Sequence, residues 1–183
     1  SPPPIVHANA AGMQVLGDPR IGGKVTICVL LYGRQHYDLH RRCLTSICST
    51  VPPSRMDLRV ATNQIGPDTI KFLRSLPVTK IYPDEGDRLK YAAMRQMLRD
   101  PELPLQTKYL VWFDDDSYVR DPAGKAWLSL LGQTILAQRP NDKVGMFGSK
   151  MLHPLPKRRK DGGDPRDWFR EAPWWRQDRK STR

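Results

Sequence analysis

The longest apolar run of the chain, KVTICVLLYG at residues 24–33, has the length of a β-strand and ends at a glycine. A continuous run of this kind is typical of a central strand that is covered on both faces. The segment 38–53 follows, and its apolar side chains predict a helix that stops at two prolines. These apolar side chains recur at helical spacing: Leu39, Cys43, Leu44 and Ile47.

The same alternation continues along the chain. Strands are predicted over 57–64, 78–84, 108–113 and 143–152, and helices over 66–77, 88–100 and 124–140. Strands that alternate with helices predict an α/β fold with a parallel or mixed sheet covered on both faces. In such a sheet, ligands bind beyond the carboxyl ends of the strands, near the point where the strand order reverses.

Composition agrees with a globular domain, because the 183 residues are 39% hydrophobic and 27% charged. No segment approaches the ~20 apolar residues of a membrane span. Residues 1–23 are rich in Pro, Gly and Ala, lack a signal-peptide pattern, and are expected to form an extended or disordered lead-in. The three cysteines contain no CxxC pair, which favours reduced thiols and a cytoplasmic location.

The net charge of +11 is compatible with nucleic acid, an anionic membrane surface or a phosphorylated substrate as partner. Its densest run, Lys157-Arg158-Arg159-Lys160, is followed by interleaved acids, which is typical of a solvated tail. A tail of this kind could bring the protein to the periphery of a membrane. Nucleic acid is a weaker expectation, because the chain has no zinc-ligand spacing, RNP-type aromatic motif or glycine-rich KH loop.

Three adjacent carboxylates, Asp114, Asp115 and Asp116, end the apolar strand in YLVWFDDDSYV. A solvated turn is one interpretation, and a divalent-cation site is the other. Mg²⁺ and Mn²⁺ take oxygen ligands, commonly one or two carboxylates together with substrate phosphates. Side chains two residues apart in an extended segment point to the same side, so Asp114 and Asp116 are expected to face one site.

Three stretches resemble family-2-like glycosyltransferases. KVTICVLLYGRQHYDLHRRCLTSICS is similar to the opening of these enzymes, and EGDRLKYAAMRQML to the basic stretch before their metal motif. YLVWFDDDSYV is similar to their metal-binding strand and to the DDD motif of Fringe-type transferases. The resemblance covers roughly 24–152 and implies the GT-A fold, a Rossmann-like three-layer α/β/α fold with a mostly parallel central sheet.

The resemblance also implies roles for individual residues. Asp116 would hold Mn²⁺ or Mg²⁺ and is the residue assigned to catalysis, while Asp114 would contact the donor or support the metal, and Asp115 could bind the sugar. The other implied contacts are with the uracil and ribose (Tyr32, Gly33 and Arg34), the base (Asn63) and the diphosphate (Lys90 and Arg95). An acid is common where Asn63 stands, so the base preference is left open.

The chain departs from the family beyond residue 152, where the acceptor-binding half is short or truncated. In the resulting division, 1–23 is the lead-in, 24–152 the nucleotide-sugar-binding domain, and 153–183 a basic, Trp-rich partial acceptor region. Glu171 is the candidate base in this region, and His153 an additional candidate metal ligand.

The expected activity is metal-dependent transfer of a sugar from a nucleotide-diphosphate sugar, UDP-linked by the resemblance, to a hydroxyl of a glycan, protein or lipid, with inversion. Two alternatives stay open. One is a catalytically incomplete nucleotide-binding domain of the same fold. The other is a basic module that binds nucleic acid or an anionic surface.

Overall fold

The computed structural model describes residues 18–84, 86, 89–119 and 127–139. The chain divides into two units, Ser1–Asp142 and Lys143–Arg183, and all the described residues belong to the first. The predicted strand over 143–152, the candidate residues His153 and Glu171, and most of the lead-in lie outside the described residues.

Strands and helices alternate as the apolar pattern predicts. The strands are β1 (Val25–Tyr32), β2 (Met56–Asn63), β3 (Lys80–Tyr82) and β4 (Leu110–Asp114). The helices are α2 (Tyr37–Cys48), α3 (Pro67–Leu73), α4 (Lys90–Leu98) and α5 (Trp127–Leu136), with one 3-10 turn, η1 (Pro53–Arg55), before β2. Pro67 is the first residue of α3, a position whose N–H makes no hydrogen bond within the helix, so the missing N–H of proline costs no helix bond.

The four strands form one sheet in the order β3-β2-β1-β4, and every pairing in it is parallel. Chain order runs outward from β1 to β3 on one side and then crosses back to place β4 on the other side of β1. The strand order therefore reverses between β1 and β4. This α/β architecture with a parallel sheet confirms the predicted fold class in its coarse form.

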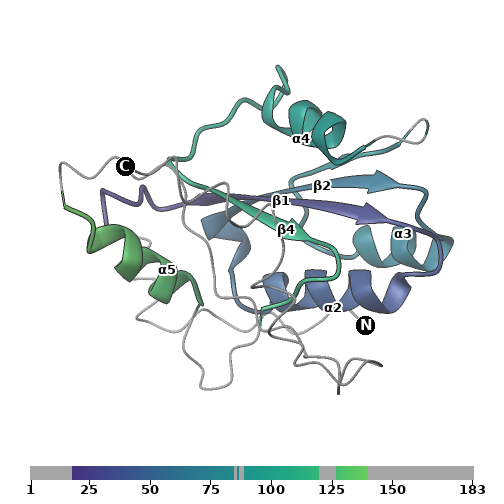
Figure 1. Cartoon of the computed structure of the whole chain (residues 1–183), viewed down its shortest axis with the longest axis horizontal. Coiled ribbons are helices and arrows are strands. Elements are labelled where there is room, and N and C mark those ends of the chain that lie inside the picture. Colours follow the sequence, from purple (N-terminus) through teal and green to yellow (C-terminus); the bar gives the residue numbers. More distant parts are fainter. Residues whose placement is uncertain (1–17, 85, 87–88, 120–126, 140–183) are drawn as a thin grey trace, which may run out of the picture. The chain divides into compact units, whose positions relative to one another are not determined.

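Helices lie on both faces of the sheet, with α4 on one face and α2 and α3 on the other (Figure 1). Alternate residues of β1 pack against the helices on the two faces of the sheet. Val25, Ile27, Val29 and Leu31 are buried with apolar residues of α2, α3 and α5. Cys28 packs instead with Ala93 and Met97 of α4. Across the residues described here, no helix has both the length and the apolar character that crossing a bilayer requires.

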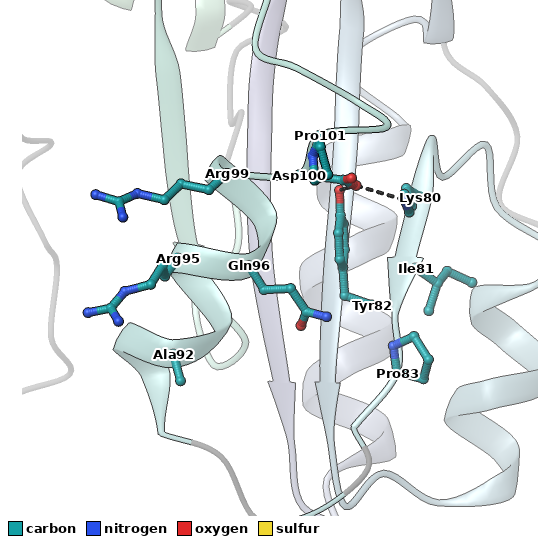
Figure 2. A pocket seen from close by; sticks show the side chains of 10 residues that line it. All are labelled: Lys80, Ile81, Tyr82, Pro83, Ala92, Arg95, Gln96, Arg99, Asp100 and Pro101. Carbon is teal, nitrogen blue, oxygen red and sulfur yellow. Dashed lines mark hydrogen bonds and ion pairs between the residues drawn. The ribbon is translucent and has the colours of Figure 1, made fainter.

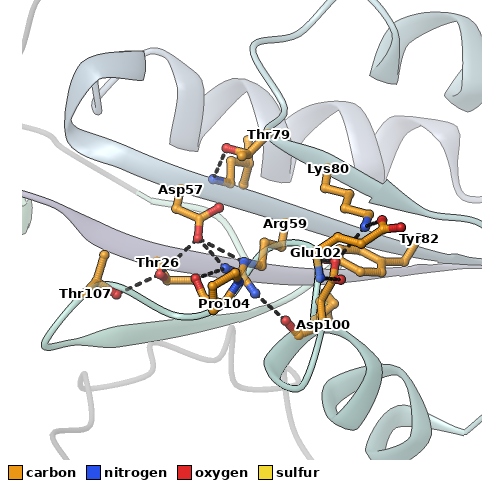
Figure 3. Close-up of polar contacts among 12 residues, drawn as sticks. Thr26, Asp57, Arg59, Thr79, Lys80, Tyr82, Asp100, Glu102, Pro104 and Thr107 are labelled. Carbon is orange, nitrogen blue, oxygen red and sulfur yellow. Dashed lines mark hydrogen bonds and ion pairs between the residues drawn. The ribbon is translucent and has the colours of Figure 1, made fainter.

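A buried arginine ties the α4 layer to the sheet. Arg59, in the middle of β2, has no exposed surface, and its guanidinium donates to the Asp57 carboxylate with an N–O distance of 2.8 Å. It also donates to the carbonyl oxygen of Met97 at 2.5 Å. The carbonyl oxygen of Pro104 accepts a further bond from it at 3.4 Å, and Figure 3 shows Arg59 between Asp57 and Pro104. One cation thus holds the end of α4 and the loop that leads toward β4, which fixes the position of that strand.

Candidate functional site

The carboxyl ends of β1 and β4 lie side by side where the strand order reverses. Leu30 of β1 is paired with Asp114 at the last position of β4, and Tyr32 is paired with Asn63 at the end of β2. The candidate residues Tyr32, Asn63 and Asp114 therefore come together at one edge of the sheet. In open parallel sheets this edge, at the reversal, is where ligands bind.

The loop after β1 needs a glycine. Gly33 has a φ of +90°, and a Cβ at this position would lie 2.5 Å from Cδ2 of His36. Its N–H donates to the carbonyl oxygen of Asn63 at 3.0 Å, which joins the ends of β1 and β2. Arg34 follows as an exposed residue, and its carbonyl oxygen lies so close to Gly66 that a Cβ there would be 2.8 Å away. The two loops are therefore in close contact.

Asp114 is paired with Lys90, the first residue of α4. The Lys90 ammonium lies 2.6 Å from Oδ1 of Asp114 and 5.3 Å from the centre of the Trp112 ring. The indole N–H of Trp112 donates to the same oxygen at 2.9 Å. Partial burial raises the pKa of the Asp114 carboxyl, but the hydrogen bonds from Lys90 and Trp112 outweigh it and leave the pKa below its ordinary value.

Asp115 points to the opposite face of the sheet, toward α2. Its Oδ2 accepts the backbone N–H of Tyr32 at 2.8 Å and lies 3.2 Å from Nε2 of the buried His40. Burial raises the pKa of the Asp115 carboxyl, and the hydrogen bonds from His40 and Tyr32 outweigh this effect, so the pKa lies below its ordinary value. The side chain is thus engaged within its own chain, at 22% exposure, where the resemblance implied a contact with the sugar.

Asp116 is not part of an extended segment. β4 ends at Asp114, and the N–H of Ser117 donates to the Asp114 carbonyl at 2.9 Å, which closes a turn. The expectation that Asp114 and Asp116 share one side through strand alternation is therefore wrong for this backbone. Asp116 is exposed, and its carboxylate forms no hydrogen bond or ion pair with the residues that the structure describes.

A cation of α2 holds this turn in place. The Arg42 guanidinium lies 4.4 Å from the centre of the Tyr118 ring and donates to the carbonyl oxygen of Asp116 at 3.4 Å. One residue on, the buried thiol of Cys43 has a pKa raised to about 12, by burial first and then by the charges of Asp115 and Asp116. The turn after β4 therefore lies against α2.

The described residues contain no group of three or more His, Cys, Asp or Glu side chains that could hold a metal ion. Lys90 already neutralises Asp114, and His40 and Tyr32 bond Asp115. This arrangement fits a divalent cation in the mode in which one or two protein carboxylates act with substrate phosphates and water. Among the described residues, Asp116 is the carboxylate of the triplet that has no bonded partner, while Lys90 and Trp112 both bond Oδ1 of Asp114.

Among the described residues, no hydrogen bond or ion pair links Arg95 to the acidic triplet. Arg95 lines a cavity of about 560 Å³ between α4 and β3, together with Tyr82, Gln96 and Arg99. Figure 2 shows the guanidinium groups of Arg95 and Arg99 extending from α4 to the side away from Lys80 and Ile81. Lys90 is thus the predicted diphosphate-binding residue that the structure brings to the acidic triplet.

Sequence reasoning missed His40 and Arg42. Both belong to the stretch DLHRRCL, which the sequence shows only as the polar side of a helix. The available signal was position, since this helix follows the loop after β1 directly and packs beside β4. In a parallel sheet the helix that leaves the end of one strand begins at the same edge as the ligand site.

Comparisons with known proteins leave this site to be interpreted from its own geometry. The sequence matches no protein-family model, and neither the curated proteins nor the solved structures yield a match.

Proposed function

We propose that the first unit of the chain binds a nucleotide-diphosphate sugar at the carboxyl ends of β1 and β4 and transfers the sugar to an acceptor hydroxyl. The observation that carries this proposal is the strand order, because the reversal between β1 and β4 lies at the acidic triplet and the loop after β1. Ligand sites in open parallel sheets occur at such a reversal. The class of donor comes from the sequence resemblance alone.

The residues around the reversal suit the parts of such a donor. Tyr32 is 49% exposed at the end of β1, and its ring would offer an aromatic face to the base or ribose. Gly33 supplies the positive φ at which the chain turns away from this edge, and the His36 ring fills the space that a side chain there would need. Asn63, buried and paired with Tyr32 across the ends of β1 and β2, stands where the resembling family commonly has an acid that meets the base.

Two cationic side chains, Lys90 and Arg42, would bind the diphosphate. The Lys90 ammonium would exchange the Asp114 carboxylate for a phosphate oxygen, and the Arg42 guanidinium lies beside the Asp116 backbone, against the Tyr118 ring. In the reaction, the bond between the sugar C1 and the diphosphate oxygen breaks as the acceptor oxygen bonds to C1. Fixed cations stabilise the charge that develops on the leaving diphosphate.

The acceptor proton passes to a base in this scheme. Glu171, the candidate base, lies outside the described residues and stays a sequence prediction. Mn²⁺ or Mg²⁺, held by Asp116 with phosphate oxygens and water, would add positive charge at the diphosphate. Asp114 could join it through Oδ2, because Lys90 and Trp112 both bond its other oxygen, Oδ1.

A thermal-shift measurement with nucleotide diphosphates and Mn²⁺ tests the proposal. At a ligand concentration about 100 times Kd, binding adds about 2.7 kcal/mol, which raises the Tm of a chain of this size by roughly 5–10 °C. Asp116→Asn should remove the metal-dependent part of this shift. Asp18→Asn should preserve it, since Asp18 is paired with Arg20 ahead of β1, at the opposite end of the sheet.

The cation is tested by a second matched pair. Lys90→Met should weaken nucleotide binding, whereas Lys71→Met, a change of an exposed lysine on α3, should leave it unchanged. Wild-type protein that gives no shift with any nucleotide diphosphate would contradict the proposal.

Further outcomes separate the alternatives. Mass spectrometry of the nucleotide sugar measures whether the sugar is released or transferred. A normal thermal shift with neither release nor transfer would indicate a binding domain that lacks turnover. Binding to mixed RNA or DNA that falls steeply with salt and does not change in Asp116→Asn would favour the basic-module alternative.

A further inference from the structure

His40 is a buried polar side chain that contacts three separate parts of the fold. Its imidazole, on the first turns of α2, has no exposed surface. Nε2 lies 3.0 Å from the carbonyl oxygen of Tyr32 and 3.2 Å from Oδ2 of Asp115. Nδ1 lies 3.1 Å from the hydroxyl oxygen of Thr69, on α3.

These distances fix the tautomer. A carbonyl and a carboxylate can only accept hydrogen bonds, so Nε2 must carry the hydrogen that both share. Nδ1 faces the Thr69 hydroxyl, which can donate a hydrogen bond to it or accept one from it. A buried imidazole with both nitrogens bonded is held in one orientation, and any group bonded to Nε2 is held with it.

The position of Tyr32 explains why such a residue is needed. β4 is paired with β1 only as far as Leu30, so Tyr32 extends past the end of its neighbour on that side. The Asp115 carboxylate takes the Tyr32 N–H in place of a strand partner, and His40 takes the Tyr32 carbonyl. Both backbone polar groups of Tyr32 therefore have partners at a place where the neighbouring strand has ended, and the three residues are held together by these hydrogen bonds.

We propose that His40 is the positioning residue of the donor site: it binds the end of β1 and the Asp115 carboxylate together, and so leaves Asp116 as the carboxylate that faces the ligand. This inference rests on the proposed function for its consequence, but its geometry can be tested without any nucleotide. The residue acts through Tyr32 and Asp115 and does not touch the reacting atoms.

Nuclear magnetic resonance of the full chain tests the geometry first. A long-range ¹H–¹⁵N spectrum should show His40 as the Nε2–H tautomer, assigned by the signal that disappears in His40→Gln. His40→Phe keeps an aromatic ring but no donor, and hydrogen exchange of the Tyr32 amide should become at least about tenfold faster. His40→Gln, which keeps an N–H near Nε2, should restore much of the protection, while the amide of Ile27 should not change.

Binding tests the consequence. His40→Phe should weaken the binding of a nucleotide diphosphate with Mn²⁺ by about tenfold or more, and His40→Gln by a few fold. Met97→Ala is the matched control, since it removes a buried side chain from the far end of α4, lowers stability, and should leave affinity unchanged.

The outcomes are separable. An Nδ1–H tautomer, or unchanged Tyr32 exchange in folded His40→Phe, would overturn the positioning role. If His40→Phe does not fold, His40→Gln and Asp115→Ala decide the matter by the same Tyr32 amide measurement. Wild-type protein that shows the Nε2–H tautomer and a protected Tyr32 amide, but binds no nucleotide, would confine the failure to the proposed function.

Discussion

Replacing Asp115 by alanine should destabilise the protein far more than the same change at Asp116. Asp115 accepts the Tyr32 N–H at 2.8 Å. It also accepts a longer hydrogen bond from Nε2 of His40, which the carbonyl oxygen of Tyr32 accepts as well. The first bond contributes about 2 kcal/mol and the shared one about 1 kcal/mol, because the acceptor is charged. Removing one of three adjacent negative charges returns about 1 kcal/mol. The expected net loss is therefore about 2 kcal/mol.

The neighbouring position supplies the contrast. The Asp116 carboxylate is exposed and has no partner among the described residues, so Asp116→Ala breaks no bond and removes the same like-charge repulsion; it should leave stability unchanged or raise it by up to about 1 kcal/mol. Asp115→Asn, which keeps an acceptor of the same shape without the charge, should cost about 1 kcal/mol.

Urea unfolding followed by circular dichroism measures the three variants against wild type, with equal m-values as the check that one transition is being compared. A loss at Asp116→Ala as large as that at Asp115→Ala would refute the assignment of bonded and free carboxylates. So would an Asp115→Ala variant as stable as wild type.

Three further expectations concern the frame of the site. Gly33→Ala should lose about 1–3 kcal/mol, because the backbone has a φ of +90° and the added methyl group meets His36, and a urea midpoint equal to wild type would contradict this. Asp100 pairs with Lys80 and accepts the Tyr82 hydroxyl, which lowers its pKa from 3.8 to about 2. Because the folded-state pKa is depressed, the contribution of Asp100 to stability is fully present above about pH 4 and is lost as the pH falls toward 2. Asp100→Asn should therefore lose less stability than wild type across that pH range. Identical acid unfolding curves for the two proteins would argue against the pairing. Burial raises the pKa of Cys28 to about 12 and of Cys48 to about 11. A thiol reagent at pH 8 should therefore modify the native chain slowly, and should modify all three cysteines after unfolding. Rapid modification of the native protein would show instead that these thiols are accessible.

Much of the frame could be predicted from local pattern. The continuous apolar run at 24–33 is β1, and the helical spacing that follows is α2, because burial on two faces and on one stripe leave different periodicities. The short strand β3 is the weakest of these matches, since it has three residues where the pattern suggested seven. Edge strands are held by one neighbour only, so their length depends on the partner more than on their own residues.

The site could be predicted only in outline. Placing Tyr32, Asn63 and Asp114 at one edge follows from parallel strands, whose carboxyl ends lie together. Two details depended on side chains distant in the sequence. Lys90 reached Asp114, whereas Arg95 lies instead at the cavity beside β3. A helix of nine residues places side chains five positions apart on different sides, and sequence alone does not show which side meets the site.

The sequence by itself determined that strands and helices alternate and that three carboxylates follow the last apolar strand described here. Only the tertiary structure decided what each carboxylate does. Asp114 meets a lysine from α4, Asp115 meets a histidine from α2, and Asp116 is left exposed on a turn. The reason is that β4 ends at the first of the three, so their directions are set by partners on opposite faces of the sheet and not by strand alternation.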